Sequence, residues 1–235
     1  IRLSLVGSEM CIRDSLSTTI LVSVLFCVLM FVGGLSWKII GGVLAVAVPS
    51  VLIFLSIVMQ EGQTLIKDYQ RNRIMAFFDP ATYADTEAYQ QLNSVIAIGS
   101  GQLWGKGLNN TDIASVKNGN FLPESQTDFI FAIIGEELGF IGSAVVILLL
   151  ILIAMRCVSI ARVAKDTAGM VIAAGIGALI GIQGFMNIAV ATMMMPNTGL
   201  PLPFVSYGLS SLVSMYIGIG FVLNVGLQRK NLYNF

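Results

Sequence analysis

The sequence contains no histidine, and only 11% of its 235 residues are charged. Without histidine, Ser-His-Asp and Cys-His nucleophile arrangements and His-ligated zinc are excluded, so any proton transfer falls to Asp, Glu, Lys, Tyr or Cys. A soluble domain carries about 25% charged residues, whereas 56% of this chain is hydrophobic, which indicates an integral membrane protein. Basic and acidic residues balance at 13 each, so no excess positive charge favours a nucleic-acid partner.

The N-terminal segment and the scarce cysteines add no functional motif. Cys11, Cys27 and Cys157 fit neither a disulfide framework nor a metal-binding spacing, so we interpret them as packing residues. Residues Ile1–Ser15 are polar and lack the long apolar core of a signal peptide. We interpret residues 1–15 as a non-native tail and residues 16–235 as a fragment of a membrane domain.

Five apolar stretches are long enough to cross a bilayer, which takes about 20 helical residues. They are Leu16–Leu35, Ile39–Met59, Phe129–Met155, Ala168–Met195 and Leu209–Leu227. A single long polar section, Gln60–Thr127, separates the second stretch from the third. The sequence therefore predicts an all-α, polytopic transmembrane helical bundle with one large loop.

Basic residues in the short connections predict the orientation of the bundle. They are Lys38 between the first two stretches, Arg156, Arg162 and Lys165 between the third and fourth, and Arg229 and Lys230 after the fifth. If the spans alternate in direction, all of them lie on one side, which is then the cytoplasmic side. The C-terminus is therefore predicted to be cytoplasmic, and the loop 60–127 and the uncharged connection Pro196–Tyr207 to be extracytoplasmic.

Two segments of the large loop have helical periodicity. Asp68–Phe78 and Glu87–Ile98 mix polar and apolar residues at helical spacing. Such helices lie on a membrane surface or pack as ordinary loop helices on the domain, and the pattern favours neither alternative.

The start of the third stretch, FLPESQTDFIFAIIGEELGFIG, concentrates acidic and small residues. Thr127 fits an N-cap that starts a helix at Asp128. In a continuous helix, the direction of Asp128 is shared by Ala132, Gly135, Glu136, Gly139 and Gly142. Glu137 points roughly the opposite way. Small residues let another helix or a lipid chain approach the backbone closely.

The three acidic residues are functional candidates with different alternatives. Asp128, in the first turn, either carries chemistry or only complements the helix dipole. Glu136 and Glu137 lie deeper, and an acid at the membrane interface or below it is a functional candidate by default.

Basic residues of the large loop are candidates for binding an anion. The segment Gly99–Gly107 (GSGQLWGKG) fails as a nucleotide phosphate loop, because its glycine spacing is short and Gly107 follows Lys106. It fits either a backbone cradle with a lysine for a diphosphate or a flexible turn. Arg71 and Arg73 follow the second stretch, where basic residues commonly meet lipid phosphates.

Two polar residues interrupt the fourth stretch. Gln183 and Asn187 lie four residues apart and share a helix face. We expect them to donate hydrogen bonds to a neighbouring helix. The following connection, MPNTGLPLPFVSYG, contains three prolines, which predicts a stiff, non-helical segment.

In five ordered motifs the chain resembles the RodA/FtsW/SpoVE family of polytopic glycosyltransferases (SEDS family), and it is closest in character to RodA. The motifs are GLSWKII at Gly34–Ile40, DYQRNRIMAFFDP at Asp68–Pro80, IAIGSGQLWGKGL at Ile96–Leu108, FLPESQTDFIFAIIGEELGFIG at Phe121–Gly142, and GLPLPFVSYG at Gly199–Gly208. The resemblance implies a ten-span protein, of which these five would be the last. Asp128 occupies the family's catalytic aspartate position.

The resemblance implies a peptidoglycan glycosyltransferase that polymerises lipid II on the outer face of a bacterial plasma membrane, in cell elongation or division. Asp128 would be the catalytic base. Lys106, Arg71, Arg73, Glu136 and Glu137 would contact substrate, and a divalent cation such as Mg²⁺ or Mn²⁺ is an alternative source of positive charge for the leaving diphosphate. The implied partner is a transpeptidase, a class B penicillin-binding protein.

Two other classes remain as alternatives. A flippase for the lipid-linked precursor would place its decisive polar groups near mid-bilayer, whereas here they cluster in and beside the large loop. A non-catalytic scaffold of a cell-wall synthesis complex would tolerate the loss of Asp128.

Overall fold

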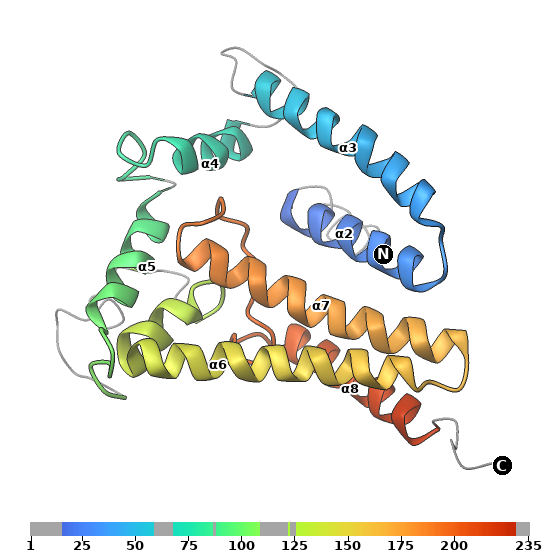
Figure 1. Ribbon diagram of the computed structural model, residues 1–235. Helices are drawn as coiled ribbons and strands as arrows, with labels where there is room; N and C mark the ends of the chain where they lie inside the picture. Colours follow the sequence, from blue (N-terminus) through green and yellow to red (C-terminus); the bar gives the residue numbers. More distant parts are fainter. Residues whose placement is uncertain (1–15, 59–67, 87, 109–121, 123–125, 229–235) are drawn as a thin grey trace, which may run out of the picture.

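The structure, a computed structural model, describes residues 16–58, 68–86, 88–108, 122 and 126–228. These residues form helices, turns and loops and contain no strand. The helices are α2 (Leu16–Val32), α3 (Trp37–Val58), α4 (Asp68–Phe78), α5 (Tyr89–Ser100), α6 (Ile130–Arg162), α7 (Thr167–Ala191) and α8 (Leu209–Leu227). Figure 1 shows α7 within the bundle, where it packs against α2, α5, α6 and α8.

All five predicted apolar stretches contain a helix. By length and composition, α6, α7 and α8 are able to cross a membrane, and α2 contributes a shorter apolar helix, Thr18–Val32. Helix α3 has 22 residues, with Pro49 inside it. The all-α membrane architecture is therefore confirmed. The number of spans, the predicted tail 1–15 and Cys11 lie partly or wholly outside the described residues and stay predictions.

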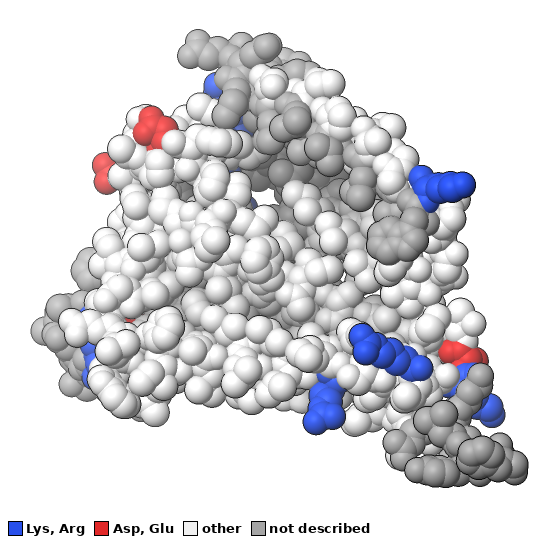
Figure 2. All heavy atoms as spheres, in the orientation of Figure 1, with Lys and Arg blue, Asp and Glu red and all other residues white. Residues whose placement is uncertain are grey.

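The connections divide between two ends of the bundle. Figure 1 shows the α2–α3 connection, the α6–α7 connection and the end of α8 at one end, and α5 with the connection after α7 at the other. On the face drawn in Figure 2, charged side chains lie over the rim of the molecule and leave a broad uncharged middle. Of the basic residues in the short connections, Arg229 and Lys230 lie outside the described residues, and the predicted orientation stays a prediction.

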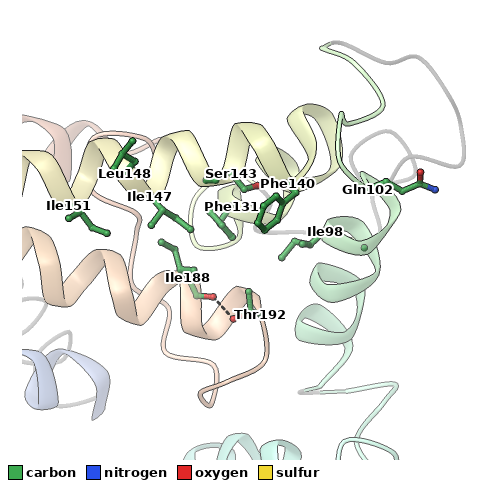
Figure 3. Close-up of a pocket in the computed structure, with 12 residues that line it drawn as sticks. Ile98, Gln102, Phe131, Phe140, Ser143, Ile147, Leu148, Ile151, Ile188 and Thr192 are labelled. Atoms are coloured by element: carbon green, nitrogen blue, oxygen red, sulfur yellow. Dashed lines mark hydrogen bonds between the residues drawn. The ribbon is translucent and has the colours of Figure 1, made fainter.

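Helix α6 differs from the predicted third span, because it is broken at Gly139. This glycine has φ 66° and ψ −163°, which is not helical, and a residue with a side chain rarely adopts such angles. Figures 1 and 3 show the short section before the break lying back beside the long one. We call Ile130–Leu138 the α6 arm and Phe140–Arg162 the α6 shaft.

A groove lined by both sections of α6 also shows that the helix folds back on itself. Phe131 of the arm and Ile147 of the shaft line one groove, although they would lie about 24 Å apart along a straight helix. The shaft alone is long enough to span the hydrocarbon core of a bilayer, about 30 Å. The prediction of one continuous helix from Asp128 was therefore wrong. The N-cap of α6 is Phe129 and not Thr127, and no side chain caps the helix.

The two helices of the large loop were predicted closely. Helix α4 has the predicted bounds, and α5 begins and ends two residues later than predicted. Gln91, Ser94 and Ala97 of α5 are buried, and α5 packs against α6 and α7. For α5, the structure therefore supports the alternative of a helix packed on the domain.

Candidate functional site

Asp128 lies in a turn, Gln126–Phe129, that leads into the α6 arm. We call it the Asp128 turn. Phe129 is buried, with 1% of its surface exposed, and packs with Ala97, Ala132 and Val190. Asp128 itself is only partly buried. The apolar anchor therefore fixes the end of the turn, beside an acidic residue that is itself only partly buried.

The proline-rich connection Pro196–Tyr207 runs beside this turn, and we call it the proline connection. The backbone N–H of Tyr207 donates to the Gln126 carbonyl (2.9 Å), and the Ser206 hydroxyl donates to the Thr127 carbonyl (2.6 Å). Gly199 has φ 65°, and a Cβ there would lie 3.3 Å from Oδ2 of Asp128. The connection is non-helical, as predicted, and it passes directly over the carboxylate.

The polar pair of α7 reaches this connection. Asn187 Nδ2 donates to the carbonyls of Asp128 and Leu200, at 2.7 Å each, and Gln183 Nε2 donates to the Pro201 carbonyl at 2.9 Å. The expectation that both would bond to a neighbouring helix was wrong. Their partners are a loop and a turn, whose backbone carbonyls have no regular helical partner.

The segment Gly99–Gly107, which we call the glycine segment, fills the break in α6. The N–H groups of Lys106 and Gly107 donate to the carbonyls of Glu136 (2.9 Å) and Glu137 (3.0 Å). In return, the N–H of Phe140 donates to the Gln102 carbonyl at 2.8 Å. The break frees backbone groups that need partners, and the glycine segment supplies them. The N–H groups of Lys106 and Gly107 thus already have hydrogen-bond partners within the chain. In the diphosphate cradle considered from the sequence, such groups would instead point at the ligand.

Lys106 and Glu136, two predicted substrate-binding residues, form an ion pair. Lys106 Nζ lies 2.8 Å from Glu136 Oε1, with side-chain exposures of 26% and 1%. The pair joins the glycine segment to the α6 arm. Their substrate-binding roles stay predictions, but the geometry gives both residues a structural role.

That structural role predicts a loss of stability when the cation is removed. Lys106→Met removes the cation that pairs with the buried Glu136, so we expect the free energy of unfolding to fall by about 3 kcal/mol. Lys106→Arg should retain most of the stability, and Lys106→Met combined with Glu136→Leu should recover part of the loss. Unfolding in detergent measures the effect. An unchanged stability of Lys106→Met would mean that the pair does not hold the two segments together.

The remaining candidates are spread more widely. Arg71 is partly buried and Arg73 exposed on α4. Figure 1 shows α4 beyond the N-terminal end of α5, whereas the glycine segment follows its C-terminal end. The 12 residues of α5 separate the two by about 18 Å. The structure therefore does not bring the arginines to Lys106. Glu137 is partly buried on the α6 arm.

An apolar groove of about 620 Å³ opens beside the site (Figure 3). It lies between the end of α5, both sections of α6 and the end of α7. Phe131, one helical turn after Asp128, lines it together with Ile147, Ile151 and Ile188. Ser143, a residue 7% exposed, also lines the groove, and its buried hydroxyl has no hydrogen-bond partner among the described atoms. The groove suits an apolar chain with few polar groups.

Sequence reasoning missed the residues that hold the Asp128 turn. Asn187 and Ser206 contact it from 59 and 79 positions away along the chain. The available signals were a polar amide inside an apolar span and a serine beside the proline-rich connection. Neither signal identifies its partner.

Together, the helices and the site define a multi-pass membrane protein with a carboxylate held at one end of its bundle. The FtsW/RodA/SpoVE cell-cycle protein family matches residues 3–231. The chain belongs to this family, which confirms the resemblance found in its motifs.

The relatives are named for one activity. The chain is 40% identical over 220 residues to the peptidoglycan glycosyltransferase MrdB of Escherichia coli (strain K12), covering 94% of this chain and 57% of that protein. It is 36% identical to the probable peptidoglycan glycosyltransferase FtsW of Nitrosomonas europaea, covering 97% and 56%. The chain thus spans little more than half the length of these relatives.

A solved structure shares the fold. Its description reads "Structural coordination of polymerization and crosslinking by a peptidoglycan synthase complex". It superposes on this chain with a TM-score of 0.68, at 27% sequence identity. The similarity covers 96% of this chain and 60% of that one.

Proposed function

We propose that the full-length protein is a peptidoglycan glycosyltransferase, with Asp128 as its general base. The observation that carries the proposal is the placement of Asp128. Asp128 is partly buried, its carboxylate lies next to Gly199, and it sits on a turn held by the proline connection. A base has to be accessible and fixed in position to accept a proton efficiently. The names of the relatives supply the reaction.

The chemistry joins two lipid-linked disaccharide-pentapeptides. A hydroxyl oxygen of the acceptor sugar attacks the anomeric carbon of the donor, and the bond from that carbon to the polyprenyl diphosphate breaks. The hydroxyl proton passes to the carboxylate of Asp128, which therefore has to be ionised beforehand. The diphosphate leaves with the electron pair of the broken bond, so positive charge near it stabilises the transition state.

Several groups are able to provide that charge. Lys106 shares its charge with Glu136, so a diphosphate would compete with that carboxylate, while Arg71 and Arg73 lie on α4. Among the described residues, no group of three His, Cys, Asp or Glu side chains is placed to bind a metal ion. A Mg²⁺ or Mn²⁺ ion, where one takes part, would be held through diphosphate oxygens together with one or two carboxylates, as Mg²⁺ commonly is.

The substrate's lipid part has a suitable surface next to the site. The groove of Figure 3 is lined mostly by aliphatic and aromatic side chains, among them Phe131, three residues after Asp128 in the sequence. A polyprenyl chain is apolar and gains free energy when such side chains remove it from water. We propose that the substrate's prenyl chain occupies this groove while its sugars face Asp128.

The location and partner follow from the same proposal. The protein would reside in the bacterial plasma membrane, with the site outside, and would act with a class B penicillin-binding protein that crosslinks the new strands. The description of the similar solved structure, which couples polymerization to crosslinking, supports a partner of this kind.

Fusions of a reporter domain test the orientation. The grouping of basic connections at one end predicts that a reporter after Phe235 is cytoplasmic and one near Asn110 is extracytoplasmic. Both positions lie outside the described residues. Two reporters on the same side would contradict the predicted arrangement of spans.

The assay that tests the function separates polymerisation from transport. The purified full-length protein, supplied with labelled lipid II in detergent, should produce glycan polymer, because detergent removes any need to move lipid across a bilayer. A flippase would move labelled lipid II across proteoliposomes without making polymer. A scaffold would do neither, so the absence of polymer from a well-folded preparation with its transpeptidase partner would refute the proposal.

A further inference from the structure

The Asp128 turn is held through its backbone carbonyls. Three consecutive carbonyls, those of Gln126, Thr127 and Asp128, accept hydrogen bonds from Tyr207 N, Ser206 Oγ and Asn187 Nδ2 at 2.9, 2.6 and 2.7 Å. All three donors come from α7 or the proline connection. The turn is therefore fixed from the C-terminal part of the chain and not only by the helix that it starts.

Asn187 supplies the Asp128 carbonyl with a hydrogen bond from a side chain distant in sequence. In a regular helix this carbonyl would accept from the N–H of Ala132, but that N–H donates to the Phe129 carbonyl instead (2.9 Å). Both partners of the Asn187 amide are carbonyl oxygens, so only its NH₂ group is able to face them. Asn187 is 1% exposed, which makes the loss of these bonds costly.

The side chain of Asn187 thus links the Asp128 turn to the proline connection. Asn187 bonds to Asp128 on the turn below and to Leu200 on the connection above, and Gly199, next to Leu200, faces Oδ2 of Asp128. We propose that Asn187 is a positioning residue for the reaction, because it fixes the Asp128 turn, and with it the carboxylate, relative to the proline connection. Ser206 supports the same turn one residue earlier. This inference rests on the proposed function.

The chain offers a matched control. Gln183 lies one turn earlier on α7, also carries an amide, and donates to a carbonyl of the same connection, at Pro201, but not to the Asp128 turn. In the full-length protein, Asn187→Leu should lower kcat for lipid II polymerisation about 100-fold, the order expected from a 1 Å misplacement. KM should change by less than about threefold, because the substrate-binding surfaces remain. Gln183→Leu should leave kcat within about threefold of wild type.

Ser206 provides the second test, which decides the matter if Asn187→Leu does not fold. The hydroxyl accepts from Leu202 N (2.7 Å) as well as donating to Thr127. Ser206→Ala should lower kcat about tenfold, and Ser206→Thr, which keeps the hydroxyl, should restore most of it. Equal effects of the two α7 variants, or a kcat of Ser206→Ala equal to wild type, would overturn the inference. Undiminished polymerisation by Asp128→Asn would instead refute the proposed function itself.

Discussion

Gly139→Ala should destabilise the protein by about 3–5 kcal/mol, although it adds only one methyl group. Two costs combine at this position. The backbone angles of Gly139, φ 66° and ψ −163°, belong to a region that is essentially restricted to glycine. A Cβ would also overlap the backbone of the glycine segment, at the amide of Gly105 and the carbonyl of Leu103. Backbone atoms cannot move aside as a flexible side-chain end can.

The same substitution in α7 is the control. At Gly181 a Cβ would lie 3.9 Å from Ala154 Cβ, so Gly181→Ala should change the free energy of unfolding by less than about 1 kcal/mol. Gly139→Leu should harm stability and function for the same reasons as Gly139→Ala. Gly135→Leu should do so too, because a Cβ at Gly135 would lie 2.9 Å from Ile98 Cγ1. Ile147→Leu should be mild. Unfolding in detergent measures all of them, and similar small losses throughout would mean that α5 and the glycine segment do not pack tightly on α6.

Asp128→Asn should reduce polymerisation by about 10³-fold or more while leaving the fold intact, because removal of a general base typically costs 10²–10⁴-fold. The amide is nearly the same size as the carboxylate, and the hydrogen bonds that hold the turn are accepted by backbone carbonyls that the substitution retains. The variant therefore separates chemistry from architecture.

Two further substitutions refine this expectation. Asp128→Glu keeps the charge but lengthens the side chain by one methylene, and the proline connection already lies close to Oδ2 of Asp128 at Gly199. We expect it to retain about 1% of the activity. Glu137→Gln should be less damaging than Asp128→Asn. If Glu137→Gln reduced polymerisation more than Asp128→Asn, Glu137 and not Asp128 would be assigned as the general base.

The helices of this protein were predictable because long apolar runs leave a chain in a bilayer few alternatives to helix. The periodicity of Asp68–Phe78 also gave the bounds of α4. The break at Gly139 was not predictable in the same way, since a single glycine is tolerated within a helix. The hydrogen-bond partners that stabilise the break come from the glycine segment, about thirty residues earlier in the chain.

The candidate site was predictable only in part. The motif around Asp128 identified the acid, but the residues that hold its turn lie in α7 and the proline connection, and helical spacing relates only residues within a few turns of each other. Lys106 and Glu136 were found as separate candidates. Their pairing depends on how the glycine segment enters α6, which no local pattern records.

The most direct test of the account is lipid II polymerisation by purified full-length protein carrying Asp128→Asn, compared with wild type at equal unfolding midpoints. The account predicts less than about 1% of the wild-type amount of glycan polymer, with lipid II binding retained. Near-normal polymer from a folded Asp128→Asn protein would contradict it, and catalysis would then have to rest on another carboxylate.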